Sequence, residues 1–210
     1  MKSEAEHIQL NETKWDRWAR KLDSNGWRYE YLRRAQSALI SILNVKEGIC
    51  FLDVGCGTGW AVGQVALLVD DKGLFYGIDL SSDMIEKAKE NFKDRSNFHF
   101  IKSNAESIPL GDNFFDIIIC TNSFHHYLNP DSALKEMHRL LKKGGRIYIL
   151  DPTADTWLMK VIDKIMGAFD PAHVKLYSVK EFQDLFADAG LKYVTMEAAD
   201  PHQKVHVGEK

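Results

Sequence analysis

One run of ten residues carries the strongest structural signal in this chain: Phe51-Leu-Asp-Val-Gly-Cys-Gly-Thr-Gly-Trp60. A short apolar stretch leads directly into three glycines at alternate positions, Gly55, Gly57 and Gly59. Twenty residues after Gly59, a second apolar stretch ends in the carboxylate of Asp79. This arrangement is typical of a nucleotide site at the carboxyl ends of two neighbouring parallel strands, where glycines let the ligand approach the backbone and an acid accepts from ribose hydroxyls.

Strand and helix patterns alternate along the chain after this run. Strand patterns cover residues 49–54, 74–80, 97–102, 115–121, 146–151 and 191–196, and helix patterns cover 60–69, 81–92, 132–142, 156–169 and 178–190. We expect Asp131 to cap the helix that starts at Ser132, and Lys143-Gly144-Gly145 to end it. Ser178 and Glu181 form the sequence pattern of a capping box. The alternation predicts an α/β fold with a doubly wound, mainly parallel sheet.

The first 45 residues precede this alternation and are polar with interspersed aromatic side chains. Trp15, Trp18 and Leu22 share one face of a predicted helix, and Asn25-Gly26 is expected to end it. A second helix is predicted over residues 28–43. We therefore expect an N-terminal helical cap over residues 1–45, joined to one α/β domain over residues 46–210.

Composition narrows the class of protein. The 210 residues suit one α/β domain, and a net charge of -3 argues against general affinity for nucleic acid or an anionic membrane. The three cysteines, Cys50, Cys56 and Cys120, show no metal-ligand spacing and are typical of reduced thiols in a cytosol. No apolar run reaches about 18 residues. We expect a cytoplasmic protein with no metal, nucleic-acid or membrane partner.

The glycine spacing bears on which nucleotide is bound. Dinucleotide sites use Gly-x-Gly-x-x-Gly, because a pyrophosphate must lie on the helix N-terminus. Here the third glycine comes one residue earlier, and Trp60 occupies the position where the dinucleotide glycine would fall. A tryptophan there would crowd a pyrophosphate but tolerates a ligand without phosphates. The spacing therefore disfavours an NAD-dependent oxidoreductase, which remains an alternative.

Several stretches resemble, in the same order, the motifs of class I S-adenosylmethionine-dependent methyltransferases. The resemblance covers roughly residues 45–195 and is closest to the small-molecule branch that includes the ubiquinone/menaquinone-biosynthesis C-methyltransferases. In the third motif, Asn104 stands where the family often has Asp. The similar stretches, in motif order, are residues 52–59, 77–84, 104–110, 115–126 and 140–147.

The resemblance implies both a fold and a reaction. The fold would be Rossmann-like, with a seven-stranded sheet whose last strand is antiparallel, and Gln203–Val207 is the candidate for that strand. The cofactor would be S-adenosyl-L-methionine, and its product S-adenosyl-L-homocysteine. The reaction would transfer a methyl group to a small-molecule acceptor by in-line displacement, without a metal or a covalent enzyme intermediate. We expect a monomer or a homodimer.

The resemblance also implies a set of cofactor-binding residues. The glycine loop would approach the methionine part, Asp79 would accept from both ribose hydroxyls, and Asn104 would accept from the adenine amino group. The loop over residues 121–123 would face the sulfur. The full expected set is Asp53, Gly55, Cys56, Gly57, Gly59, Asp79, Leu80, Met84, Asn104, Ala105, Glu106, Thr121, Asn122 and Ser123.

Some of these residues have a second interpretation. Leu80 and Met84 either sandwich the adenine or pack as ordinary core at a helix start. Asp53 either hydrogen-bonds loop amides or reaches the cofactor ammonium through water, because a buried acid without a partner is costly. Glu106 either contributes to the adenine pocket or only caps and is solvated.

His125 and His126 follow the loop expected to face the methyl group and are candidate catalytic residues. A histidine there could act as a general base. In the alternative, one of the pair hydrogen-bonds the loop backbone and the other is exposed. Asp151, His173 and Tyr177 fall near the carboxyl side of the fifth strand, where they could orient a nucleophile.

Aromatic side chains outside the motifs suggest a covered acceptor pocket. Trp15, Trp18, Tyr31 and Trp157 could line it, although core packing in the cap is the more common role for each one alone. The broad apolar face over residues 156–169 and the N-terminal cap predict a lid over a small, partly apolar acceptor.

The acceptor atom stays open, with carbon, oxygen, nitrogen and arsenic as possibilities. The chain lacks the Asn-Pro-Pro-Tyr signature of relatives that methylate adenine or amides, and Thr121-Asn-Ser-Phe124 stands in its place. This disfavours DNA and glutamine side chains and leaves small metabolites. A catalytically silent subunit that binds S-adenosylmethionine and acts through a partner is the alternative from a different class.

Overall fold

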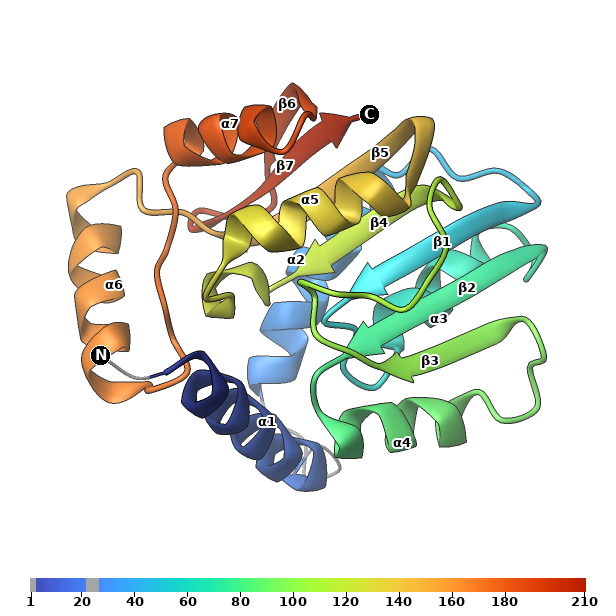
Figure 1. Cartoon of the computed structure of the whole chain (residues 1–210), viewed down its shortest axis with the longest axis horizontal. Coiled ribbons are helices and arrows are strands. Elements are labelled where there is room, and N and C mark those ends of the chain that lie inside the picture. The colour runs from blue at the N-terminus through green and yellow to red at the C-terminus, as the bar shows by residue number, and fades with distance from the viewer. Residues whose placement is uncertain (1–2, 22–26) are drawn as a thin grey trace.

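Seven strands form one sheet in the order β3-β2-β1-β4-β5-β7-β6 (Figure 1). The computed structural model describes residues 3–21 and 27–210, so the expectations for Leu22 and for a break at Asn25-Gly26 lie outside the described residues. The strands are β1 (Ile49–Val54), β2 (Gly73–Asp79), β3 (Phe98–Lys102), β4 (Phe115–Thr121), β5 (Leu141–Pro152), β6 (Lys192–Ala198) and β7 (Gln203–Glu209).

Strand direction matches the sequence prediction. Strands β3, β2, β1, β4 and β5 pair in parallel, whereas β7 pairs antiparallel with both β5 and β6. The last strand is therefore inserted next to the edge in the antiparallel direction, as expected for Gln203–Val207. Because β1, β2, β3 and β4 run the same way, their carboxyl ends meet at one edge of the sheet.

Helices cover both faces of the sheet (Figure 1). They are α1 (Glu4–Lys21), α2 (Trp27–Ser41), α3 (Trp60–Leu67), α4 (Ser82–Asn91), α5 (Pro130–Leu140), α6 (Trp157–Phe169) and α7 (Val179–Asp188). Buried residues of α2, α3 and α4 form one core with Phe51, Phe75 and Ile119. Buried residues of α5 and α7 form a second core with Leu52 and Ile118. Successive residues of one strand therefore enter opposite cores, as the period of two requires for a sheet covered on both faces.

The join between α5 and β5 differs from the sequence prediction. The helix starts after Asn129 with Pro130 in its first turn, so Asp131 is not its cap, and it ends at Leu140. Lys143-Gly144-Gly145 lies within β5, where the pairing with β4 shifts register and Gly144 has φ +77°. Pairing of Leu141 with Phe115 starts the strand early, and the glycines accommodate the bulge.

The predicted capping box and the predicted apolar helix over residues 156–169 are both present, but most of the apolar residues of that helix are not buried. The Ser178 side chain accepts from the Glu181 amide at the start of α7, and the Glu181 side chain accepts from the Ser178 amide, as predicted. In α6, by contrast, Met159 alone among the described residues of the helix is fully buried, and Trp157 and Phe169 are 77% and 85% exposed. The apolar surface of α6 therefore faces largely outward.

None of the helices over residues 3–21 and 27–210 is long and apolar enough to cross a membrane.

Gly77 tests the packing behind the glycine loop. A Cβ at Gly77 would lie 2.7 Å from Phe100 Cδ1 and 2.8 Å from Cys56 Sγ. We expect Gly77→Ala to lower the free energy of unfolding by about 1–3 kcal/mol, because both neighbours must move. Urea denaturation measures this. Gly111→Ala is the matched control, since nothing lies within 4 Å of its added Cβ; equal losses in the two variants would contradict the packing argument.

Candidate functional site

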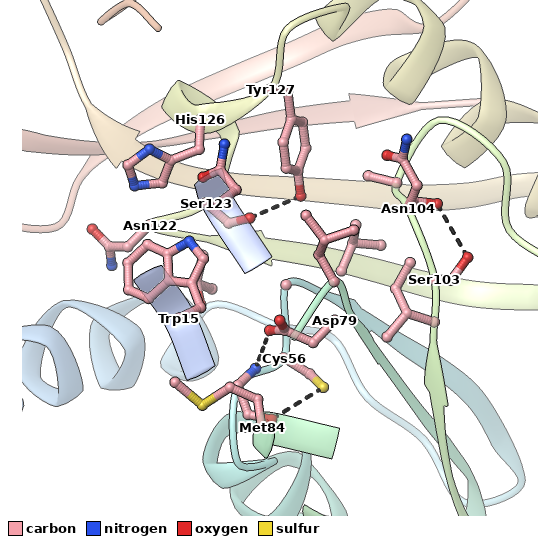
Figure 2. A pocket seen from close by; sticks show the side chains of 18 of the residues that line it. Trp15, Cys56, Asp79, Met84, Ser103, Asn104, Asn122, Ser123, His126 and Tyr127 are labelled. Atoms are coloured by element: carbon pink, nitrogen blue, oxygen red, sulfur yellow. Dashed lines mark hydrogen bonds between the residues drawn. The ribbon is translucent and has the colours of Figure 1, made fainter. Parts of the chain in front are cut away.

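A cavity of about 220 Å³ lies at the carboxyl ends of β1, β2 and β4 (Figure 2). Three loops that follow these strands meet there, together with the segment after β3. Side chains of α1 and α2 complete the wall. The sequence-predicted residues that line it are Gly55, Cys56, Gly57, Asp79, Leu80, Met84, Asn104, Ala105, Glu106, Thr121, Asn122, Ser123 and His126.

The three glycines of the loop play different parts. All have positive φ, at +81°, +53° and +83° for Gly55, Gly57 and Gly59, which favours glycine at each. A Cβ at Gly55 would lie 2.4 Å from Ser123 Oγ, and one at Gly59 would lie 2.9 Å from the Phe100 ring. At Gly57 the nearest atom is Met84 Sδ, 4.0 Å away. Gly57 therefore leaves room for a ligand, whereas Gly55 and Gly59 are packed against protein, and Gly59 does not line the cavity.

Asp79 holds the glycine loop against the next strand. Its Oδ2 accepts from the Gly57 amide at 2.9 Å, and its Oδ1 accepts from the Ser81 amide at 2.9 Å. Burial raises the pKa of this carboxyl, and the amide donors of Ser81, Gly57 and Leu80 oppose that shift. An acid that already accepts from two amides keeps lone pairs for ribose hydroxyls, so the geometry is compatible with the predicted role.

Asp53 lies behind the cavity at the end of β1. The residue is fully buried, does not line the cavity, and its Oδ1 has no hydrogen-bond partner. Burial raises the pKa of Asp53 to about 8, and the nearby Asp79 charge adds to the shift. The amides of Gly55 and Cys56 both donate to the Ile78 carbonyl. Asp79 and Ile78, in place of Asp53, therefore organise these loop amides.

The loop after β4 carries an unpartnered donor. Asn122 has φ +53°, its amide donates to the Leu150 carbonyl at 2.8 Å, and its buried Nδ2 has no partner. Ser123 Oγ donates to Tyr127 Oη at 2.9 Å, as the dashed line in Figure 2 shows. Thr121 Oγ1 accepts from Gln36 Nε2 of α2 at 2.8 Å. The loop is therefore held from two sides, and the buried Nδ2 of Asn122 has no partner within the protein.

Asn104 is partly engaged within its own turn. Its Oδ1 accepts from the Glu106 amide at 3.1 Å, which leaves the second lone pair of that oxygen for a ligand. Glu106 in turn accepts from Asn129 Nδ2 at 3.0 Å, so this side chain ties the turn to the start of α5. Both residues line the cavity.

The two candidate catalytic histidines are both buried. His125 Nδ1 lies 2.8 Å from Asp151 Oδ1, and its amide donates to Asp151 Oδ2 at 2.9 Å. His126 Nδ1 donates to the Ala172 carbonyl at 2.9 Å. Burial, with the neighbouring His125 second, lowers the pKa of His126. The alternative with one exposed histidine is therefore wrong, because the segment before α7 covers the pair. His126 alone of the two lines the cavity.

Helix α1 closes the cavity from the N-terminal side. His7 Nε2 donates to the His126 carbonyl at 2.9 Å, and Asp16 Oδ1 accepts from Ser81 Oγ at 2.5 Å. Lys14 pairs with Asp170 at 2.5 Å. Three separate segments of the α/β domain thus anchor one helix.

Two of the four predicted aromatic residues enter the wall. Trp15 and Trp18 line the cavity, and the Trp15 ring meets the His126 ring edge-on at 5.3 Å between centroids. Tyr31 and Trp157 are 41% and 77% exposed and lie outside it. The expectation that residues 156–169 cover the pocket is wrong, because none of these residues lines the cavity, and α6 packs Met159 against Ala154 and Leu176 instead.

Sequence reasoning missed several lining residues. They come mainly from the cap, where hydrophobic periodicity indicates a helix but not what its polar side chains contact. These residues include His7, Asn11, Leu32, Arg33, Gln36 and Tyr127. The closeness of Tyr127 to the fourth motif was the one available signal.

The sheet order, the tight glycine loop and the acid on the neighbouring strand define the class I S-adenosylmethionine-dependent methyltransferase fold. Comparison with known proteins agrees. The methyltransferase domain family matches residues 45–190. The uncharacterized methyltransferase YcgJ of Bacillus subtilis is 32% identical over 146 residues, which cover 68% of this chain and 56% of YcgJ. Its crystal structure gives a TM-score of 0.67 at 27% identity, over 79% of this chain and 72% of that one.

Two further relatives point the same way. The ubiquinone/menaquinone biosynthesis C-methyltransferase UbiE of Shewanella oneidensis is 33% identical over 115 residues, 53% of this chain and 46% of UbiE. A SAM-dependent methyltransferase from Aquifex aeolicus gives a TM-score of 0.68 at 25% identity, over 82% of this chain and 88% of that one. The chain spans about half the length of the curated relatives it matches. It belongs to the S-adenosylmethionine-dependent methyltransferase family.

Asp53 predicts a pH-dependent stability. The pKa of its carboxyl in the folded protein, about 8, exceeds the unfolded value of about 3.9. The stability that comes with the bound proton is therefore complete at low pH and is lost as pH rises through about 8. Asp53→Asn has no carboxyl to ionise and therefore avoids this loss of stability at high pH. We expect its melting temperature to exceed that of the native protein by several °C at pH 8.5 and by much less at pH 5. Each kcal/mol of stability corresponds to about 2–4 °C for a chain of this size.

Thermal melts without cofactor at the two pH values measure this difference. Asp94→Asn, which removes an exposed carboxyl, is the control and should show no such pH dependence. A difference between Asp53→Asn and the native protein that did not change with pH would contradict a raised pKa at this position.

Proposed function

We propose that this protein is an active enzyme that methylates a small-molecule acceptor, by in-line displacement, inside the cavity closed by α1. The observation that supports this most directly is the open space at Gly57 beside the Asp79 carboxylate. Bound S-adenosylmethionine supplies an electrophilic methyl group on its sulfonium, and S-adenosylhomocysteine is the product.

The residues present fit this cofactor. A Cβ at Gly57 would meet nothing closer than 4.0 Å, so a ligand can approach the backbone there. Asp79 would accept from the ribose hydroxyls, and Asn104 from the adenine amino group. Leu80 and Met84 line the same cavity and would flank the adenine.

The enzyme's own part in the reaction is to position the two reactants and exclude water. Trp15 and Trp18 line the cavity, and the anchored helix α1 forms one of its walls. Of the two candidate catalytic histidines, His126 is the one whose ring reaches the cavity wall. His125 would act behind it, in its bond with Asp151.

The acceptor that we propose is small and partly apolar. Trp15, Trp18 and Trp60 all line the cavity, and aromatic walls favour flat or apolar ligands. The relative UbiE is a C-methyltransferase of ubiquinone and menaquinone biosynthesis, which is consistent with an acceptor of that character. Turnover of methyl-labelled S-adenosylmethionine with a metabolite mixture tests activity, and binding without any turnover would favour a silent partner subunit.

Asp79 tests the cofactor assignment. We expect Asp79→Ala to weaken S-adenosylhomocysteine binding by about 10–100-fold, because charge-assisted hydrogen bonds are lost. Isothermal calorimetry measures this, with circular dichroism to show that the variant is folded. Asp94→Ala, an exposed acid, serves as the control. The native protein should give no heat with NAD, and tight NAD binding without a response to S-adenosylhomocysteine would overturn the assignment.

Trp15 tests the cap as a lid. We expect Trp15→Ala to weaken S-adenosylhomocysteine binding about tenfold, since about 1.4 kcal/mol of contact energy corresponds to that factor. Arg17→Ala changes an exposed residue on the same helix and should leave the affinity unchanged. Equal affinities for the native protein and the Trp15 variant would show that α1 does not contribute to the bound state.

A further inference from the structure

Three buried imidazole rings converge beside the cavity. His125 and His126 belong to the short 3-10 helix that follows β4, and His173 belongs to the segment between α6 and α7. One nitrogen from each ring lies within 4.8 Å of the others. The ring centroid of His125 lies 4.0 Å from that of His126 and 5.6 Å from that of His173.

Each ring has one nitrogen hydrogen-bonded to an oxygen that can only accept. The pairs are His125 Nδ1 with Asp151 Oδ1 at 2.8 Å, His126 Nδ1 with the Ala172 carbonyl at 2.9 Å, and His173 Nε2 with Asp163 Oδ1 at 2.7 Å. These nitrogens therefore carry a hydrogen, and in a neutral imidazole the opposite nitrogen holds a lone pair. This is the state in which imidazole binds a metal ion.

The lone pair of His173 lacks any partner within the protein. Its side chain is 1% exposed, and its Nδ1 is buried without a hydrogen bond. A buried polar atom without a partner is unfavourable. A metal ion bound by all three rings would supply the partner that His173 Nδ1 lacks.

We propose that His125, His126 and His173 bind one divalent transition-metal ion, for which zinc is the expected species. Three histidines with an open fourth position form a known type of catalytic zinc site, and imidazole nitrogens suit zinc and its late first-row neighbours. The carboxylates of Asp151 and Asp163 orient two of the rings, as carboxylates do for metal-bound histidines.

The dimensions and charges suit such an ion. Nitrogens bound tetrahedrally to zinc at 2.0–2.1 Å lie about 3.3 Å apart, so shifts of about 1 Å would close the present set. The charges of Asp151 and Asp163 together offset those of the ion. Lys14, whose charge acts on His126, is itself paired with Asp170 at 2.5 Å.

A metal ion bound by the three histidines would lie next to the cavity. His126 belongs to both the cluster and the cavity wall, so the fourth ligand would be water or an oxygen, nitrogen or sulfur atom of an acceptor. No metal was expected from the sequence, since the cysteines lack metal-ligand spacing, and His173 is far along the chain from His125 and His126. Binding of the ion does not depend on the proposed methyl transfer, so the two can be tested independently.

Direct metal binding tests the site. Untagged full-length protein is stripped with a chelator and titrated with Zn²⁺ by calorimetry and with Co²⁺ by absorption spectroscopy. We expect one equivalent of each ion and the intense visible bands of tetrahedral cobalt. His173→Gln should lose at least about 100-fold in Zn²⁺ affinity. Asp163→Asn, which keeps all three rings, should lose about 10–100-fold.

The matched control is His202→Gln, which removes an exposed histidine outside the cluster and should bind Zn²⁺ like the native protein. Circular dichroism shows whether each variant is folded, and Asp163→Asn decides the matter if His173→Gln does not fold. Failure of the native protein to bind one equivalent at micromolar Zn²⁺ would overturn the proposal. So would equal affinities for the native protein, Asp163→Asn and the control.

Discussion

The hydrogen bond from the Gly57 amide to the Asp79 carboxylate, 2.9 Å long, is the constraint on which the site depends. It joins the loop after β1 to the end of β2, and the Ile78 carbonyl adds two more bonds from the Gly55 and Cys56 amides. These bonds hold the loop in a conformation that needs positive φ at three glycines. The result is a rigid backbone surface at Gly57 with open space in front of it, which side chains alone would not provide.

The same edge of the sheet is closed by segments that come from both ends of the chain. Helix α1 is anchored to the His126 carbonyl, to Ser81 and to Asp170, and so spans the cavity from the loop after β4 to the start of α4. The segment before α7 covers the histidine pair from the other side. Burial of the paired rings follows from this double covering and sets their chemistry, since it keeps His126 neutral.

The pattern of residues predicted much of this architecture, and particular failures show where it could not. The other strands and the Ser178 capping box depend on local periodicity and spacing, whereas the antiparallel strand at Gln203–Val207 was implied by the family resemblance; all were confirmed. The early start of β5 was missed because cross-strand pairing with Phe115 overrides the glycine signal. The prediction that α6 covers the pocket was wrong. The sequence shows that this helix has an apolar face, but it does not show whether that face contacts a pocket or solvent.

Local sequence was enough to establish the fold class, the family and the loops that meet at the strand ends, because parallel strands bring their carboxyl ends together wherever the motifs occur. Contacts between distant segments were needed for the rest. Gln36 reaches Thr121, His7 reaches the loop after β4, and His173 joins His125 and His126, all across long stretches of chain. Such contacts are selected by packing of whole helices and loops in three dimensions, and short-range periodicity does not record them.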